Sequence, residues 1–174
     1  VEVAPRGDAT PHVLVTTGGG GDGSRMIDTY LQGLSGLAPE MRPRTTIVLG
    51  PEMPADRRAD LLGRFAHLAP TVTFLEFEPD LPLLLAQSDV VSLHCPLDDT
   101  TRGSFDAEAF AAMKPGGLFI TTARGGVHDE AALAEALTSG HLAGAGLDVW
   151  APEPPPLDSA LLQLDTVVAT YHTA

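Results

Sequence analysis

The sequence is poor in cysteine, in positive charge and in long apolar runs. Its single cysteine, Cys95, excludes an internal disulfide and a cysteine-rich zinc site. Only 10 of the 174 residues are lysine or arginine, against 23 aspartates and glutamates, so the formal net charge is −13. A surface this acidic repels phosphate backbones and anionic lipids, which argues against nucleic-acid and membrane-surface partners. Any anionic ligand must therefore be held by local backbone donors or by single arginines.

Membrane and export signals are also missing. No apolar stretch approaches the roughly 18 residues of a membrane span, and no secretory signal peptide opens the chain. We therefore expect a soluble, globular protein of the reducing cytoplasm. The length predicts one domain with a sizeable core. Because the chain opens on Val1 and not on methionine, we expect a fragment or a processed chain.

The sequence does contain a regular alternation of short apolar runs with segments of helical period. The runs are apolar throughout, as is typical of parallel strands covered on both faces. They predict seven strands, at His12–Thr17, Thr45–Leu49, Val72–Phe77, Asp89–His94, Leu118–Thr122, Gly144–Val149 and Thr166–Thr170. Helices are predicted between them, at Ser24–Leu37, Pro54–Ala69, Asp80–Gln87, Asp106–Met113 and Asp129–Ser139.

This order of elements predicts an α/β fold: a Rossmann-like, doubly wound parallel sheet of about seven strands in three layers. Residues 12–174 are predicted to form one domain, preceded by a flexible arm at Val1–Pro11. The segment Ala151–Leu157 (APEPPPL) is predicted to be a stiff extended linker, because no helix accommodates its prolines.

A glycine-rich loop lies between the first predicted strand and the first predicted helix. It fits the pattern G-x-G-x-x-G at Gly18, Gly20 and Gly23. Glycines let a backbone approach a phosphate, and a helix N-terminus supplies free N–H donors. The pattern favours a dinucleotide site, and the alternative is a turn that binds no ligand. Glu52 is the candidate acidic ligand for the ribose, although its spacing from the glycines is longer than usual.

The first half resembles the nucleotide-sugar-binding lobe of a GT-B glycosyltransferase, over about residues 12–92. The resemblance rests on VLVTTGGGGDGSRMIDTYL, RTTIVLGPEMPADRR and VTFLEFEPDLPLLLAQSDVVS. It implies that the glycine loop faces the diphosphate of a nucleotide sugar. The later strands of that lobe, and an acceptor lobe, have no counterpart in the sequence.

From about Leu81 the sequence resembles the D-isomer-specific 2-hydroxyacid dehydrogenases, the group that includes phosphoglycerate dehydrogenase. The matching phrases are LLAQSDVVSLHCPLDDTTRG, DAEAFAAMKPGGLFITTARGG, DEAALAEALTSGHLAGAGLDVW and APEPPPLDSALLQLDTVVATYHTA. This resemblance implies NAD as the cofactor. It also implies that Arg124 binds the substrate carboxylate and that His172 exchanges a proton with the substrate oxygen. Glu153 would pair with His172, orient its ring and raise its pKa.

The same resemblance implies which residues surround the nucleotide. It places His94, Cys95, Pro96 and Leu97 around the adenine, and Thr122, Ala123 and Asp148 near the nicotinamide and its ribose. Taken singly, each residue has a simpler interpretation. Arg124 fits a surface turn, Glu153 a solvated linker and His94 a strand end. Their occurrence together in matching phrases favours the functional interpretation for the set.

Several departures from the family limit what the resemblance implies. The family's glycine fingerprint is replaced by the glycosyltransferase-like loop, and Tyr171 stands where proline is usual. The chain stops at Ala174, before the helix that normally follows the histidine, and no segment corresponds to the substrate-binding domain. We therefore expect a hybrid, joined at about residues 78–92, with weak or no turnover by itself.

Three functions stay open on the sequence alone. The chain is an NAD(H)-binding domain, a nucleotide-sugar-binding module, or a folded scaffold that binds neither. Arg57 and Arg58 come one helical turn after the second strand, which argues against recognition of the 2′-phosphate of NADP. The dehydrogenase resemblance also implies a homodimer.

Overall fold

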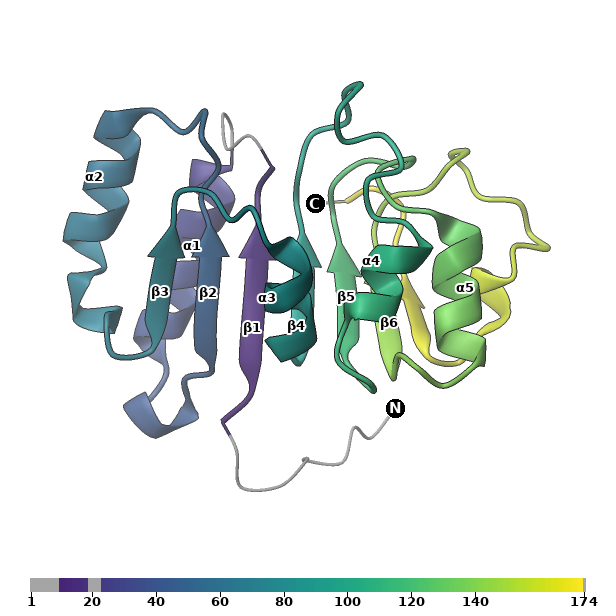
Figure 1. Cartoon of the computed structure of the whole chain (residues 1–174), viewed down its shortest axis with the longest axis horizontal. Coiled ribbons are helices and arrows are strands. Elements are labelled where there is room, and N and C mark those ends of the chain that lie inside the picture. The colour runs from purple at the N-terminus through teal and green to yellow at the C-terminus, as the bar shows by residue number, and fades with distance from the viewer. Residues whose placement is uncertain (1–9, 19–22, 174) are drawn as a thin grey trace.

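The computed structural model describes residues 10–18 and 23–173. Most of the predicted arm and the glycine-loop residues Gly19–Asp22, which include Gly20, lie outside the described residues. Seven parallel strands form one sheet in the order β3-β2-β1-β4-β5-β6-β7 (Figure 1). They are β1 (His12–Thr16), β2 (Arg44–Val48), β3 (Val72–Leu75), β4 (Val90–Leu93), β5 (Leu118–Thr121), β6 (Gly144–Leu147) and β7 (Val167–Ala169). The predicted doubly wound sheet is confirmed.

Helices cover both faces of this sheet. The α-helices are α1 (Ser24–Gly36), α2 (Ala55–Arg64), α3 (Leu81–Gln87), α4 (Ala107–Ala112) and α5 (Glu130–Thr138). Short 3-10 helices are η1 (Pro39–Met41), η2 (Ala66–Leu68) and η3 (Leu161–Gln163). Helix α1 packs with α2, whereas α3 and α5 each pack against α4. Figure 1 shows α3, α4 and α5 in front of the sheet and α1 behind it. Among the described residues, no helix combines the length and the apolar character needed to cross a membrane.

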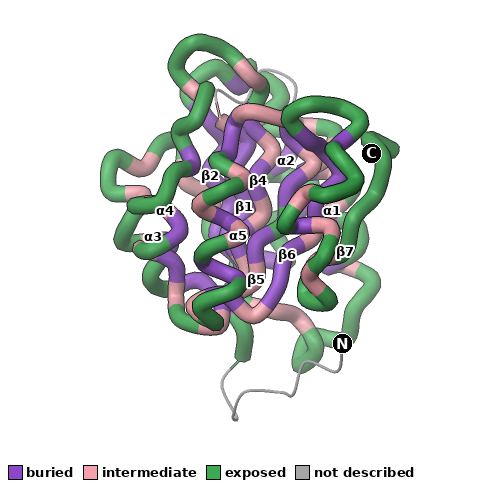
Figure 2. Tube along the Cα trace, turned by 90° about the vertical axis from the view of Figure 1, so that its right-hand side faces the viewer, coloured by how far each residue is buried: buried purple, intermediate pink, exposed green. Residues whose placement is uncertain are grey.

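The apolar runs of the sequence follow from this double cover. Successive side chains of a strand point to opposite faces. In β1, Leu14 belongs to the core cluster beneath α3, α4 and α5, whereas its neighbour Val15 packs with Ile27 and Leu61 beneath α1 and α2. Both faces therefore need apolar residues, and Figure 2 shows the buried positions following the strands through the centre of the molecule.

Local chemistry sets several helix ends as the sequence predicts. The carboxylates of Asp106 and Asp129 accept backbone N–H groups at the starts of α4 and α5, which satisfies donors that have no partner within the helix. Gly140 follows α5 with a φ of +76°, a conformation that glycine adopts readily.

Two predicted segments differ in the structure. The predicted helix Pro54–Ala69 is divided, because α2 ends at Arg64 and η2 follows it after Phe65, which is buried against the core. The prediction that Ala151–Leu157 forms an extended linker was wrong, because residues 151–154 form a bend. The Glu153 carboxylate accepts the Trp150 N–H at 3.0 Å, and this contact folds the segment back on itself.

Candidate nucleotide and substrate site

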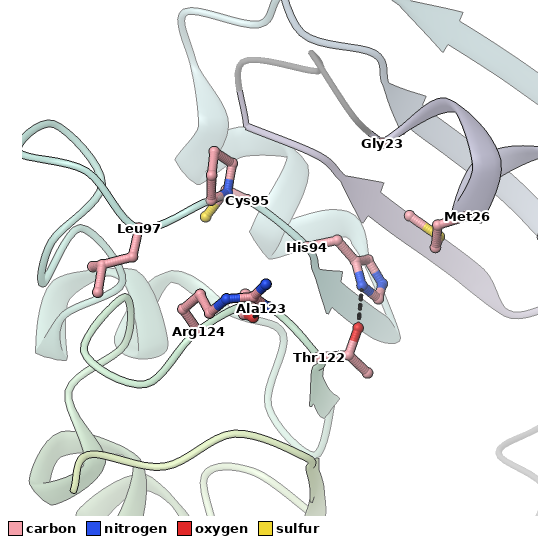
Figure 3. Close-up of a pocket in the computed structure, with 9 residues that line it drawn as sticks. Gly23, Met26, His94, Cys95, Leu97, Thr122, Ala123 and Arg124 are labelled. Atoms are coloured by element: carbon pink, nitrogen blue, oxygen red, sulfur yellow. Dashed lines mark hydrogen bonds between the residues drawn. The ribbon is translucent and has the colours of Figure 1, made fainter. Parts of the chain in front are cut away.

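The carboxyl ends of β1 and β4 lie side by side where the strand order reverses. Ligands of open α/β sheets bind in the crevice at this point. A cavity of about 500 Å³ opens there. It is lined by Gly23, Met26, His94, Cys95, Pro96, Leu97, Thr122, Ala123 and Arg124 (Figure 3). All but Met26 are residues that the sequence nominates for cofactor or substrate, so the fold brings together positions that are about 100 residues apart.

Two glycines at the cavity are required by close packing. A Cβ atom on Gly18, whose φ is +62°, would lie 2.4 Å from the Cys95 Cβ. A Cβ on Gly23 would lie 2.7 Å from the Cβ of Thr17, so Gly23 lets α1 begin directly against the end of β1. A dinucleotide-binding loop requires glycines in these two roles, one for the tight turn and one for the close contact between helix and strand.

The start of α1 suits an anionic group. Its first turn contains no acidic residue, and no side chain caps it among the described residues. The free N–H groups and the positive end of the helix dipole therefore face the glycine turn. With the cavity beside them, these residues fit a dinucleotide diphosphate. In the described ranges, no group of three or more His, Cys, Asp and Glu side chains is arranged to hold a metal ion.

His94 and Cys95 form a neutral wall of the cavity. The His94 Nδ1 lies 2.8 Å from the Thr122 hydroxyl oxygen (Figure 3), and its Nε2 lies 2.7 Å from that of Ser92. Burial lowers the pKa of His94 to about 4, and it raises the pKa of the Cys95 thiol to about 11. At neutral pH both side chains are therefore uncharged, which suits contact with a flat base and not proton transfer.

The catalytic candidates Glu153 and His172, which are 19 residues apart in the sequence, form a hydrogen-bonded pair. The His172 Nδ1 lies 2.8 Å from the Glu153 Oε2, and each side chain is a little over one-third exposed. The hydrogen bond from His172, together with that from the Trp150 N–H and the charge of Arg124, holds the pKa of Glu153 below its ordinary range. The charge of Arg124 therefore reaches the pair. The Arg124 Nη1 itself donates to the Ala123 carbonyl oxygen at 2.7 Å.

Asp148 anchors the segment that carries His172. It is buried, and its Oδ1 accepts the Thr170 hydroxyl at 2.5 Å and the Thr173 N–H at 2.9 Å. Its backbone oxygen accepts the His172 N–H at 2.7 Å. Asp148 does not line the cavity. The structure thus shows a supporting role that the sequence did not indicate.

Not every predicted residue reaches the cavity. Glu52 is exposed and lies outside the lining, and Glu153 and His172 also lie outside it. Met26, which the sequence did not indicate, lies on the first turn of α1 and faces the pocket (Figure 3). The only feature of the sequence that indicates this role is that Met26 comes one helical turn after Gly23, and it can be used only when the first residue of α1 is known.

Comparison with known proteins identifies the family. A model described as the NAD binding domain of D-isomer specific 2-hydroxyacid dehydrogenases matches residues 66–174. The chain belongs to this family. It is an NAD-binding domain of D-2-hydroxyacid dehydrogenase type, and the resemblance drawn from its second half is confirmed.

Curated relatives match this dehydrogenase domain over about half of its length. It is 52% identical over 94 residues to "(S)-sulfolactate dehydrogenase" of Chromohalobacter salexigens, a match covering 54% of this chain and 30% of that protein. It is 52% identical over 89 residues to "D-3-phosphoglycerate dehydrogenase" of Mycobacterium tuberculosis, covering 51% of this chain and 17% of the relative. The matched segment therefore covers less than a third of either relative.

Solved dehydrogenase structures align with nearly the whole domain. A D-isomer specific 2-hydroxyacid dehydrogenase from Xanthobacter autotrophicus Py2 covers 98% of this chain at 34% identity, with a TM-score of 0.70, and 49% of that protein is covered. The apo D-mandelate dehydrogenase of Rhodotorula graminis covers 93% at 30% identity, with a TM-score of 0.69 and 41% of that protein covered. A further structure of the Xanthobacter enzyme, at 32% identity, contains NADPH.

These comparisons give no support to the glycosyltransferase resemblance or to a hybrid. The dehydrogenase structures align with both halves of the chain. The physical reason for the misleading signal is that a glycine turn between a strand and a helix occurs in many nucleotide-binding folds. In the fold, Gly18 and Gly23 lie at the carboxyl end of β1, which is paired with β4, where a dinucleotide fingerprint belongs.

Proposed function

We propose that the chain binds NAD(H) in the cavity between β1 and β4 and presents Arg124, Glu153 and His172 to a 2-hydroxy acid. The observation that carries this proposal is the hydrogen bond between Glu153 and His172, with its oxygen and nitrogen 2.8 Å apart. The charge of Arg124 also contributes to lowering the pKa of Glu153. Glu153 and His172 would thus transfer the proton and Arg124 would bind the substrate carboxylate, at the same edge of the sheet as the glycine turn.

The cofactor would be held by residues from both halves of the sheet. Backbone donors around Gly18, Gly20 and Gly23 would bind the diphosphate, and Glu52 would reach the ribose. The wall His94, Cys95, Pro96 and Leu97 would contact the adenine. Thr122 and Ala123 would lie near the nicotinamide, and Asp148 would support this end of the site. Bound NAD supplies the hydride acceptor for oxidation of the hydroxyl carbon.

The chain's own residues would bind and deprotonate the substrate. The Arg124 guanidinium presents parallel N–H donors that match a carboxylate. His172 would take the hydroxyl proton on oxidation and return it on reduction, and the Glu153 carboxylate would stabilise the resulting imidazolium. A histidine suits both directions because its ordinary pKa lies near neutrality.

The proposed activity of the chain alone is weak or absent. The structural relative from Xanthobacter is about twice as long as this chain, and the matched segments cover only 30% and 17% of the two curated relatives. We propose that a substrate-binding domain closes over Arg124 and His172 and excludes water, as active sites of this kind require. The expected homodimer stays a prediction.

The proposal predicts that Gly23→Val strongly weakens NADH binding. The new side chain collides with Thr17, so the start of α1 must move away from the glycine turn. Titration calorimetry is expected to give a loss of affinity of at least about 10-fold, which corresponds to about 1.4 kcal/mol. Gly33→Ala is the matched control, because a Cβ at Gly33 meets no atom within 4 Å.

Circular dichroism establishes that both variants are folded before they are titrated, and Gly23→Ala replaces Gly23→Val if the latter is not. A folded Gly23 variant with the NADH affinity of the unmodified chain would show that the diphosphate binds elsewhere. The Gly33→Ala control is expected to keep the dissociation constant within about twofold.

A further inference from the structure

Trp150, which stands between β6 and the bend at residues 151–154, contacts the segments of two catalytic candidates. It is the chain's only tryptophan, and 3% of its surface is exposed. Its backbone N–H donates to the Glu153 Oε1 at 3.0 Å. Its indole N–H donates to the Thr170 carbonyl oxygen, also at 3.0 Å, two residues before His172. The acid and the base of the proposed pair are thus tied to the same residue.

The third catalytic candidate, Arg124, lies on a turn whose backbone packs closely against that of Trp150. A Cβ built on Gly125 would lie 1.7 Å from the Trp150 carbonyl oxygen and 2.4 Å from its carbon. The turn that carries Arg124 therefore rests directly on the Trp150 backbone. The adjacent Ala151 N–H donates to the Glu130 Oε1 at 2.6 Å, which holds the same backbone from the side of α5.

The partly exposed pair of Glu153 and His172 needs other residues to hold its two side chains in place. The Glu153–His172 contact is worth little by itself, because both side chains are more than one-third exposed, solvent screens the interaction and two side chains must be ordered. His172 also has a φ of +52°, a conformation that non-glycine residues adopt only where the surroundings hold them. The hydrogen bonds that join Asp148 and Trp150 to this segment provide that support.

We propose that Trp150 is the positioning residue that fixes Glu153, His172 and the Arg124 turn relative to one another. This inference rests on the proposed function for the roles of those three residues. Phenylalanine would fill most of the same core volume, so packing alone does not require an indole. The function of the indole N–H is to hold the His172 segment at Thr170.

The test is a pH titration of the His172 ring, followed by NMR in the unmodified chain, Trp150→Phe and Glu153→Gln. Among the described residues, the relevant charged groups are Glu153, which bonds the ring, and Arg124, whose charge acts on Glu153. Asp148 bonds the Thr173 N–H, and Glu130 bonds the Ala151 N–H. Glu153→Gln defines the titration of an uncoupled His172. In Trp150→Phe, we expect the His172 titration midpoint to move at least halfway from the value of the unmodified chain to that of Glu153→Gln.

A control separates positioning from general loss of stability. Leu68→Ala opens a hole in the other core cluster, beneath α1 and α2, and is expected to leave the His172 titration unchanged while lowering the melting temperature. A folded Trp150→Phe protein whose His172 titrates as in the unmodified chain would overturn the proposal. The readout needs neither NADH nor turnover, so failure of NADH binding would refute the proposed function and leave this result standing.

If Trp150→Phe does not fold, the unmodified chain provides the decisive measurement. Because Trp150 is the only tryptophan, the intrinsic tryptophan fluorescence reports on it alone. We expect this fluorescence to change with pH in step with the NMR titration of His172, and to lose that step in His172→Gln. Fluorescence that shows the same pH step in His172→Gln as in the unmodified chain would contradict the proposal.

Discussion

Gly125→Ala is expected to destabilise the fold by about 3 kcal/mol or more, because the added methyl group cannot be accommodated without moving backbone. The Cβ would overlap the Trp150 carbonyl, which is held by its own chain neighbours and not by a side chain that could rotate away. For a domain of this length, such a loss lowers the melting temperature by about 6–12 °C. Thermal unfolding followed by circular dichroism measures it.

The matched control for this substitution is Gly33→Ala within α1. No atom lies within 4 Å of the new Cβ, and alanine favours the helix over glycine, so stability is expected to rise by up to about 1 kcal/mol. If Gly125→Ala melted at the temperature of the unmodified chain, the close contact between the Arg124 turn and Trp150 would not exist in solution. The positioning role of Trp150 would then lose one of its three contacts.

Acid is expected to destabilise the protein between about pH 6.5 and pH 4, through the buried His128 and the half-buried His94. Burial lowers the pKa of both His94 and His128 from 6.5 to about 4. The unfolded chain takes up these protons as the pH falls through 6.5, whereas the folded chain does not until about pH 4. The free energy of unfolding therefore falls across this window, by about 3 kcal/mol for each histidine.

His128 allows this prediction to be tested without touching the cavity. The side chain is buried beside Phe119, with ring centroids 5.6 Å apart, and neither of its ring nitrogens has a hydrogen-bond partner among the described residues. His128→Leu is expected to reduce the loss of stability between pH 7 and pH 4 by about 3 kcal/mol. Urea denaturation at a series of pH values measures the difference, and the non-titrating variant Leu68→Ala serves as the control. An unchanged slope in His128→Leu would show that this ring is protonated in the fold.

The fold could be predicted from the sequence because its strands are continuous apolar runs with β-branched residues, and the observed strands fall within the predicted ranges except at Arg44. The bend at residues 151–154 could not be predicted, since it depends on a hydrogen bond from the Trp150 N–H to the Glu153 side chain across Ala151 and Pro152. The strand order is also a long-range property. It is the placement of β1 beside β4, and not any local pattern in the first half, that distinguishes a dinucleotide site from other glycine turns.

The site was predicted from resemblance more than from spacing. Nothing in the local sequence requires the His172 ring to contact the Glu153 carboxylate, because β7 lies between the two residues in the chain. The supporting residues Asp148 and Trp150 follow directly after β6, and their contacts to Thr170 arise only when β6 and β7 pair. Sequence periodicity marks such residues as buried but does not reveal their partners.

The measurement that tests the central claim most directly is calorimetric melting of the chain alone, with saturating NADH and with saturating UDP-glucose. A ligand at about 100 times its dissociation constant adds about 2.7 kcal/mol to the free energy of unfolding. In a domain of this length, that gain raises the melting temperature by about 5–10 °C. We predict this rise with NADH and no change with UDP-glucose. A rise with UDP-glucose only, or a sharp melt unchanged by either ligand, would contradict the assignment of the cavity to NAD(H).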